Sequence, residues 1–389
     1  MSLRIRARLA AACLVTLGLA LAGPATLDAA QAGDQPHGHH HGHHHRHHGP
    51  GQLDVMTQNL YLGSPLTPAL AATTPAEFVA AVAQIYGTMV ATDFPKRAQA
   101  IADTIAHERP DLIGLEEVSK WTATPLVAGA NPPSYDFLAI LQAALAKRGL
   151  HYSVAAVSDN ADIGPAPLVA PDFGCGVPTS PTTPQCVVRL QDRDVVLVDD
   201  ATRGLAVRDS ASGEYTAQQT FAPPGTTEPV SFARGWAYID ASYVGKRFRF
   251  LVTHLETEDF PAVQEAQAKE FLAGPAHTRG TVIAVGDFNS AADPATTTQP
   301  TASYSLLTKS WFDDAWLEAG HGPGLSCCQN GTLSNPTSQL SERIDLVLLH
   351  GRVRAINAHL VDDQPISTTP PFWPSDHAGV VARVRLPIW

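Results

Sequence analysis

Apolar positions recur with two different periods along the chain. Alternation with a period of two, and short runs of β-branched residues, are typical of strands. Recurrence every three or four residues is typical of amphipathic helices. The predicted strands are 53–60, 111–115, 151–157, 194–198, 236–243, 248–253, 282–285, 343–349 and a closing strand that ends at 384. The predicted helices begin at Pro75 and Phe94 and cover 135–148 and 262–272. Strands that alternate with helices in this way indicate an α/β fold.

Polar side chains stand where several of these strands begin or end. Asn59 ends the first strand, and the pair Glu116 and Glu117 ends the second. If these two strands are parallel and adjacent, their polar ends lie at the same edge of a sheet. Adjacent residues of a strand point to opposite faces, so only one glutamate of the pair can face a site there. The other fits a solvated loop.

The stretch 282–290, V-I-A-V-G-D-F-N-S, has the strongest pattern of this kind. Gly286 permits a sharp turn, and Asp287 and Asn289 then point the same way if the chain stays extended. A carboxylate beside a carboxamide at a strand end suits the binding of a water and a cation. An Asx turn that merely ends a core strand is the alternative interpretation.

Composition indicates a globular protein with a substantial core, since 44% of residues are hydrophobic and 16% are charged. The formal net charge of -11 argues against a broad basic surface for nucleic acid, although it permits a local basic groove. The best basic cluster is Lys246, Arg247 and Arg249. It also fits an ordinary hairpin turn.

The first 51 residues are not expected to join the folded domain. Residues 1–32 combine an arginine-containing start, an apolar segment and a small-residue cleavage site, which predicts a secretory signal peptide. Residues 33–51 contain a tract of nine histidines and predict a disordered linker. One domain is expected over 52–389. We therefore expect a secreted, extracellular protein without a stable membrane anchor, and no obligate protein partner is evident.

Four cysteines remain after the predicted signal peptide: Cys175, Cys186, Cys327 and Cys328. An even number in an exported chain suggests disulfides, and four cysteines allow three full pairings. Cys327 and Cys328 either bridge each other or pair elsewhere. The sequence leaves the pairing open.

Six short motifs occur together in one order: T-Q-N-L, G-L-E-E-V, T-H-L-E, G-D-F-N-S, R-I-D-L-V and S-D-H-A-G-V. With these motifs the chain resembles the endonuclease/exonuclease/phosphatase superfamily, which includes deoxyribonucleases and neutral sphingomyelinases. The motifs span 55–384, nearly all of the predicted domain. The resemblance implies a four-layer α/β sandwich, with two mixed sheets face to face and helices outside. It also implies metal-assisted hydrolysis of a phosphate ester.

The resemblance assigns a role to each polar strand end. A divalent cation would be held by Glu117, Asn59 and Asp376. In catalysis Asp287 would activate the attacking water, and Asn289 beside it would hold the phosphate or the water. His377 would bind or protonate a phosphate oxygen, and Asp345 would fix the tautomer of His377. His254 would contact the phosphate from the opposite side. Because these groups are mainly oxygen donors, Mg²⁺ or Mn²⁺ suits the site better than zinc.

Two departures from the family pattern and the choice of substrate stay open. Glu116 replaces the usual glutamine, and Arg193 is the candidate for the arginine or tyrosine that often binds substrate. Nucleic acid and a phospholipid head group are the leading substrates, and 370–374, P-P-F-W-P, is either an exposed apolar loop or a packed lid. A phosphatase for small phosphate esters is an alternative. A non-catalytic metal-binding protein that uses the histidine tract is another.

Overall fold

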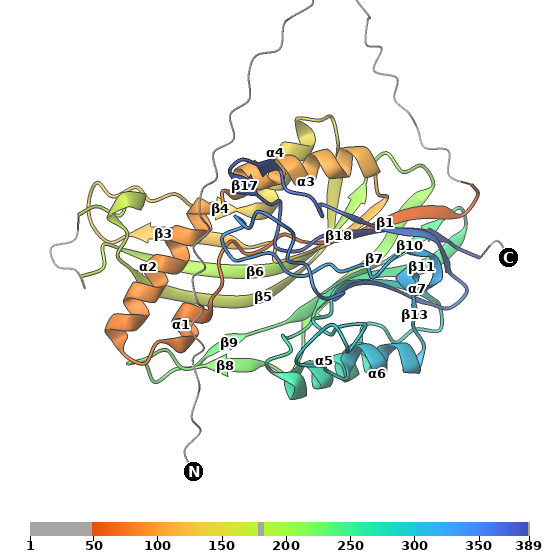
Figure 1. Ribbon diagram of the computed structural model, residues 1–389. Coiled ribbons are helices and arrows are strands. Elements are labelled where there is room, and N and C mark those ends of the chain that lie inside the picture. The colour runs from red at the N-terminus through yellow and green to blue at the C-terminus, as the bar shows by residue number, and fades with distance from the viewer. Residues whose placement is uncertain (1–48, 178–182, 388–389) are drawn as a thin grey trace, which may run out of the picture. The chain divides into compact units, whose positions relative to one another are not determined.

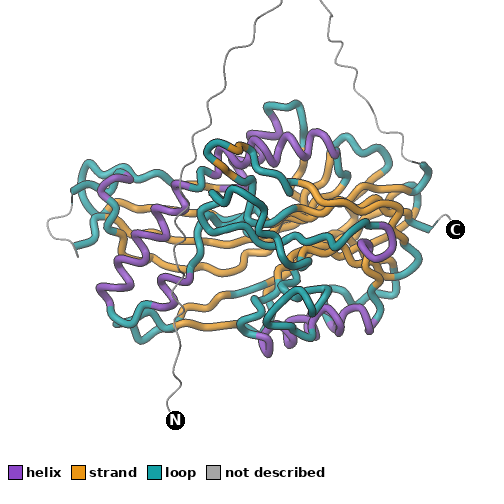
Figure 2. The backbone as a smooth tube through the Cα atoms, viewed as in Figure 1, coloured by secondary structure: helices purple, strands orange, loops and turns teal. Residues whose placement is uncertain are grey.

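Two β-sheets lie face to face in the centre of the domain, and helices cover their outer faces (Figure 1). The computed structural model describes residues 49–177 and 183–387. The predicted signal peptide and residues 33–48 of the predicted linker lie outside these ranges. The four layers confirm the predicted α/β sandwich, and Figure 2 shows the strands as the central layers.

The larger sheet has eight strands, most of them antiparallel. The order is β15-β18-β1-β2-β6-β3-β4, and β5 pairs along the remaining edge of β6. Its strands are β1 (Gln52–Asn59), β2 (Leu112–Glu116), β3 (Lys120–Pro125), β4 (Tyr135–Asp136), β5 (Tyr152–Leu168), β6 (Cys186–Asp199), β15 (Arg354–Val361) and β18 (Gly379–Arg385). β1 and β2 are parallel neighbours, which meets the condition for bringing their polar ends to one edge of the sheet.

The smaller sheet has six strands in the order β13-β14-β12-β11-β10-β7. They are β7 (Leu205–Glu214), β10 (Gly235–Tyr243), β11 (Lys246–His254), β12 (Thr281–Asp287), β13 (Asp313–Asp314) and β14 (Asp345–His350). β10 and β11 form the predicted hairpin, and β11 runs parallel to β12. Two further pairs are small: β8 (Gln219–Phe221) with β9 (Val230–Phe232), and β16 (Ser367–Thr368) with β17 (Pro371–Phe372).

Helices pack on the outer face of each sheet. α2 (Pro75–Ala91), α3 (Phe94–Glu108) and α4 (Phe137–Ala146) share one core with the larger sheet. α5 (Pro261–Ala273) and α6 (Ser303–Ser310) share another with the smaller sheet. α1 (Thr67–Ala71), the 3₁₀ turn η1 (Pro171–Phe173) and α7 (Ala315–Ala319) are short. The Thr74 hydroxyl accepts a hydrogen bond from the Glu77 N–H, and Pro75 occupies the first turn, which explains where α2 begins.

A third core fills the space between the two sheets with alternate residues of each strand. Gly114 of β2 shows how closely the sheets approach. A Cβ atom at this position would lie 2.9 Å from a methyl group of Val252 and would also strike Val285, both on the facing sheet. The absence of a side chain at Gly114 therefore sets the local spacing of the sandwich.

The segment 159–186 differs from its prediction as an irregular excursion. β5 continues to Leu168 and pairs with β6 along its whole length, through three register shifts. Gly164 and Pro165 lie at one of these shifts, where they interrupt the alternation that a sequence pattern detects. A disulfide joins Cys175, in the connection that follows, to Cys186 at the start of β6.

Within the described ranges, no helix is long and apolar enough to cross a membrane.

Candidate active site

Five polar side chains meet where the layer between the sheets ends. On the larger sheet Asn59 lies opposite Glu116. On the smaller sheet His254, Asp287 and Asp345 lie side by side on β11, β12 and β14. All five positions continue the alternation that places apolar residues of the same strands between the sheets. The site is thus the polar end of the inter-sheet core.

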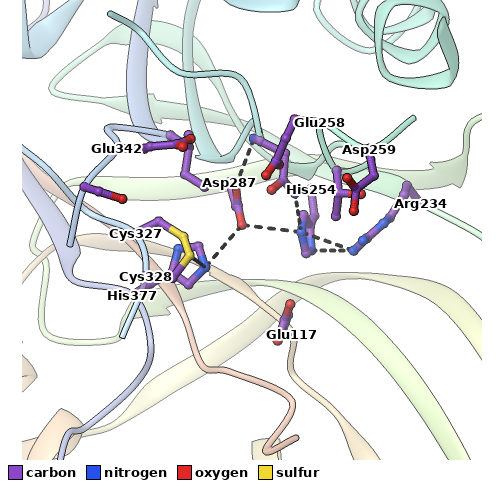
Figure 3. A pocket seen from close by; sticks show the side chains of 14 residues that line it. Glu117, Arg234, His254, Glu258, Asp259, Asp287, Cys327, Cys328, Glu342 and His377 are labelled. Carbon is purple, nitrogen blue, oxygen red and sulfur yellow. Dashed lines mark hydrogen bonds and ion pairs between the residues drawn. A yellow bond between two sulfur atoms is a disulfide. The ribbon is translucent and has the colours of Figure 1, made fainter. Parts of the chain in front are cut away.

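A cavity of about 360 Å³ opens at this end (Figure 3). Carboxylates, histidines and one arginine dominate its wall. The residues labelled in Figure 3 are Glu117, Arg234, His254, Glu258, Asp259, Asp287, Cys327, Cys328, Glu342 and His377. The structure therefore brings Glu117, His254, Asp287, Asn289 and His377 of the predicted set to one cavity.

Asp287 is held on both carboxylate oxygens. Its Oδ1 accepts the Asn289 N–H at 2.9 Å, and its Oδ2 accepts the Asn59 amide at 3.1 Å. Gly286 makes this turn possible, because its φ is 149° and a Cβ atom there would collide with the Thr253 carbonyl oxygen. Burial raises the pKa of Asp287 to about 7, against the opposing effect of His377. A buried carboxylate with such a pKa can accept a proton near neutral pH.

His377 and Asp345 form a hydrogen-bonded pair beside Asp287. Nδ1 of His377 lies 2.8 Å from Asp345 Oδ2, and its Nε2 lies 3.8 Å from Asp287 Oδ2. Burial alone would lower the pKa of His377, but the neighbouring carboxylates outweigh it and hold this pKa well above its usual value. The neighbouring carboxylates therefore favour the protonated form of this ring, and its Nε2 faces Asp287 and Cys328 in the cavity wall.

His254 is the neutral counterpart of His377. Burial lowers the pKa of His254 well below its usual value, and the cation of Arg234 adds to the effect. The guanidinium of Arg234 lies 3.0 Å from His254 Nδ1, and the Asn289 amide lies 3.1 Å from Nε2. The surroundings of the two imidazoles thus shift their pKa values in opposite directions, with one ring on either side of Asp287 (Figure 3).

Arg234, rather than Arg193, supplies the arginine of the cavity. Arg193 donates to the Val118 carbonyl at 2.9 Å and to Asp136 at 2.7 Å, and it is not among the residues that line the cavity. Arg234 directly precedes β10, whereas the sequence pattern drew attention to the carboxyl ends of strands. In the sequence, Arg234 is marked only by its place next to Gly235, just before the predicted hairpin.

Glu117 and Asp376 suit a divalent cation. Oε2 of Glu117 accepts the Leu62 N–H at 2.5 Å, and burial, followed by the charges of Asp376 and Asp192, raises the pKa of Glu117 to about 8. Burial also raises the pKa of Asp376. A bound cation would relieve the repulsion that raises these pKa values. Asn59 presents an amide oxygen that already accepts the Tyr61 N–H at 2.8 Å.

Two further carboxylate oxygens near the site are buried without a protein partner in the described part of the chain. Oε2 of Glu116 and Oδ1 of Asp345 have no hydrogen-bond partner among the described residues. The donor atoms of Asp287, Asp345 and His377 lie within 4.8 Å of one another and could also hold an ion. This donor set is rich in oxygen, as Mg²⁺ and Mn²⁺ require. The residues present therefore fit a hard divalent cation.

Glu116 corrects one expectation. Its side chain is fully buried and accepts the Thr57 hydroxyl at 2.8 Å, so the glutamate beside Glu117 does not lie in a solvated loop. The backbone of Glu117 turns out of the strand with a φ of 53°. Both glutamates are thereby held at the same end of the sandwich.

Arg97 fixes the two loops that carry the cation-site candidates. This fully buried guanidinium donates to the carbonyls of Thr92 at 2.9 Å, Leu60 at 2.5 Å, Tyr61 at 3.1 Å and Pro374 at 3.1 Å. Leu60 follows Asn59, and Pro374 stands two residues before Asp376. One side chain of α3 therefore determines the spacing between these two loops.

We expect Arg97→Lys to lower the free energy of unfolding by about 2–4 kcal/mol, because an ammonium group cannot reach all four carbonyls and leaves buried acceptors unpaired. Urea unfolding followed by circular dichroism measures the change. Arg354→Lys is the matched control, since Arg354 is 60% exposed and its ion pairs lie at the surface. Equal unfolding midpoints for the two variants would contradict this role of Arg97.

Comparisons with known proteins agree with this architecture. A model of the Endonuclease/Exonuclease/phosphatase family matches residues 56–377. A comparison with curated protein sequences gives no match. Among solved structures, a family protein from Bacteroides thetaiotaomicron is 14% identical, with a TM-score of 0.54, over 88% of this chain and 100% of its own.

Two further structures are similar over 86% of this chain. A mannosyl-6-phosphatase from Bacteroides thetaiotaomicron VPI-5482 is 13% identical over 100% of its chain, with a TM-score of 0.52. An endonuclease/exonuclease/phosphatase from Beutenbergia cavernae DSM 12333 is 20% identical over 72% of its chain, with a TM-score of 0.51. At these identities the likeness concerns the fold.

Proposed function

Because the chain belongs to the Endonuclease/Exonuclease/phosphatase family, we propose that it hydrolyses a phosphate ester of a small soluble molecule with the help of a divalent cation. The position of His377 beside Asp287 in the cavity wall, with 3.8 Å between Nε2 and Oδ2, carries this proposal. One group can take a proton from water while the other faces the phosphate. The rest of the site can be assigned around these two residues.

Asp287 accepts the proton of the attacking water, and its two amide partners keep the carboxylate aimed at that water. His377 donates from Nε2 to a phosphoryl or leaving oxygen, while Asp345 holds the proton on Nδ1. Asn289 and the neutral His254 contact the phosphate from the other side. Arg234 adds a positive charge next to them.

Glu117, Asn59 and Asp376 would hold the cation, which would be Mg²⁺ or Mn²⁺. When bound, the cation stabilises negative charge on the phosphoryl and leaving oxygens. The raised pKa values of Glu117 and Asp376 support this assignment, because a site that gathers buried carboxylates is incomplete without a positive charge.

The acidic rim of the cavity favours an isolated phosphate ester over a nucleic acid. Glu258, Asp259 and Glu342 stand around its mouth. Burial, and after it the charges of Glu342 and Asp259, raise the pKa of Glu258. A nucleic acid would place further phosphates beside these carboxylates. Like charges at that distance disfavour binding.

The basic cluster of the sequence lies far from this mouth. Lys246 begins β11 and His254 ends it, so at about 3.3 Å per residue the two are roughly 26 Å apart. Arg249 is occupied by Asp240, with two contacts of 2.8 Å. These residues therefore cannot contact the phosphates that directly neighbour one held in the cavity.

The apolar stretch 370–374 also gives little support for a lipid substrate. Trp373 is 2% exposed, donates to the Asn335 carbonyl at 2.8 Å and packs with Tyr61 and Leu333. Phe372 packs against the same cluster. The stretch serves as a packed support beneath Asp376: both of its aromatic side chains pack on the protein, and of its five residues Pro370 alone is exposed.

Export from the cell forms part of the proposal. The Cys175–Cys186 disulfide supports it, because such bonds persist mainly in oxidising compartments. The predicted signal peptide supports it from the sequence side.

The substrate class can be tested with three compounds: p-nitrophenyl phosphate, bis-p-nitrophenyl phosphate and supercoiled plasmid DNA, each with Mg²⁺ and with EDTA. We expect Mg²⁺-dependent hydrolysis of a small ester, with kcat/KM at least about a hundredfold above that for plasmid nicking, a difference of about 2.7 kcal/mol. Faster nicking of plasmid would assign the enzyme to nucleic acid instead. No metal-dependent turnover of any substrate would favour a non-catalytic metal-binding protein.

A further inference from the structure

The disulfide between the neighbouring residues Cys327 and Cys328 forms part of the catalytic cavity wall. Sγ of Cys328 lies 3.7 Å from Nε2 of His377 (Figure 3). Cys328 is open to solvent at this point. The hydrolytic mechanism proposed above uses neither sulfur atom, and the bond is far in sequence from the other disulfide.

The backbone holds this pair in place without the help of the sulfur–sulfur bond. Cys327 exchanges hydrogen bonds with Glu342, N–H to carbonyl, at 3.0 Å in each direction. The residues on either side of the pair are bonded to the His377 segment, Ser326 to Ala378 and Gln329 to Asp376, both at 2.8 Å. If the disulfide is reduced, the two thiols therefore stay beside His377.

The three side chains lie close enough together to bind one ion. In the oxidised protein both Sγ atoms and a ring nitrogen of His377 lie within 4.8 Å of one another, and reduction frees the two Sγ atoms to separate to the spacing that one ion requires. Asp345 binds the opposite ring nitrogen, Nδ1, at 2.8 Å. Histidines that bind metals usually have such a carboxylate on the other nitrogen, which fixes the ring and strengthens the ligand. Nε2 is thus directed toward the sulfur atoms.

We propose that Cys327, Cys328 and His377 form a cation site, selective for thiophilic divalent ions such as Zn²⁺, that exists only when the Cys327–Cys328 disulfide is reduced. A dithiol reductant supplies two electrons and two protons, becomes a disulfide itself, and leaves two thiols on the protein. Binding of the ion then releases both thiol protons and the Nε2 proton of His377 to solvent. Two thiolates and an imidazole suit zinc and disfavour Mg²⁺.

The site would compete with hydrolysis, and this consequence rests on the function proposed above. An ion on Nε2 removes the proton that His377 would present to the phosphate. It also places a second cation in the cavity that Glu117 lines. In the oxidised protein the two sulfur atoms bind no ion, because a disulfide offers no thiolate.

Cobalt titration of the full-length chain tests the site directly. Co²⁺ bound by thiolate gives a charge-transfer absorption that nitrogen ligands alone do not give, so ions bound by the histidine tract do not contribute to it. One sample is kept oxidised. Another is reduced with a dithiol, and the dithiol is then removed under anaerobic conditions. We expect the absorption only in the reduced sample, saturating at about one Co²⁺ per chain and abolished by Zn²⁺.

A variant and a chemical control assign the signal. The double variant Cys327→Ser/Cys328→Ser retains Cys175 and Cys186. Any absorption that it shows after reduction therefore comes from that pair. Alkylating the reduced wild-type protein removes the site without relying on a variant that must fold. An absent signal in reduced wild type, or an equal signal in the double variant, would overturn the proposal. Because no substrate is present, the result is independent of whether the chain hydrolyses phosphate esters.

A second measurement tests the competition. Equimolar Zn²⁺ is expected to slow Mg²⁺-dependent ester hydrolysis by the reduced enzyme at least about tenfold and to leave the oxidised enzyme unchanged. Equal inhibition of both forms would place the inhibitory ion elsewhere.

Discussion

Replacing Asp287 with asparagine is expected to lower kcat for a small phosphate ester by about a hundredfold to ten-thousandfold, the range for loss of a positioned general base. Asparagine keeps the size of the side chain, and its single oxygen can still accept from one of the two N–H groups that bind Asp287, those of Asn59 and Asn289. It cannot take a proton from water. Initial rates with saturating Mg²⁺ measure the effect, and KM should change little.

Asp313→Asn is the matched control for this variant. Asp313 lies on β13 of the same sheet, but its side chain is 54% exposed and pairs with Arg354 at the surface. Its replacement should leave kcat within about twofold of wild type, since exposed pairs contribute little. If Asp287→Asn also kept near-normal turnover, the assignment of the base would be wrong.

Replacing Glu117 with glutamine is expected to weaken Mn²⁺ or Mg²⁺ binding by at least about a hundredfold, because substitutions that only support a ligand already cost ten- to a hundredfold. The matched control is Glu265→Gln, on the exposed face of α5 and paired with Lys269. Calorimetric titration of both variants measures the affinity. Equal affinities would remove Glu117 from the cation site.

The affinity of the wild-type protein for the cation should also depend on pH. Burial raises the pKa of Glu117 to about 8, so without a cation this carboxyl is protonated at neutral pH. A cation must displace that proton, and its apparent affinity therefore falls as pH drops below about 8, by up to about tenfold per pH unit. Above pH 8 the affinity should level off. Titrations at pH 6, 7, 8 and 9 test this, and a pH-independent affinity would contradict it.

The sequence predicted the elements that place the site, since each has a regular pattern. The run 282–285 alternates between two packed faces, and the positions at its end become fixed once one face is buried. The pairing of Asn59 with Glu116 follows from one β-α-β unit. Short-range periodicity and turn residues were sufficient for this part.

Other parts depend on contacts between distant residues, which no local pattern encodes. The extension of β5 depends on β6 more than on its own alternation, because its register shifts three times. Arg234 becomes a site residue only because β10 lies beside β11 and brings its guanidinium to His254. The four carbonyl partners of Arg97 come from three separate segments, so its role is visible only in the folded chain.

Some residues of the cavity lie at strand ends and others lie on loops, and the two groups tolerate insertions differently. His254, Asp287 and Asp345 are locked in one row of paired strands, where inserting a single residue would turn a catalytic side chain to the opposite face. Glu258, Asp259 and Glu342 stand on connections whose length has no such restriction. Changes in loop length can therefore alter which ester is accepted while the hydrolytic chemistry is inherited intact.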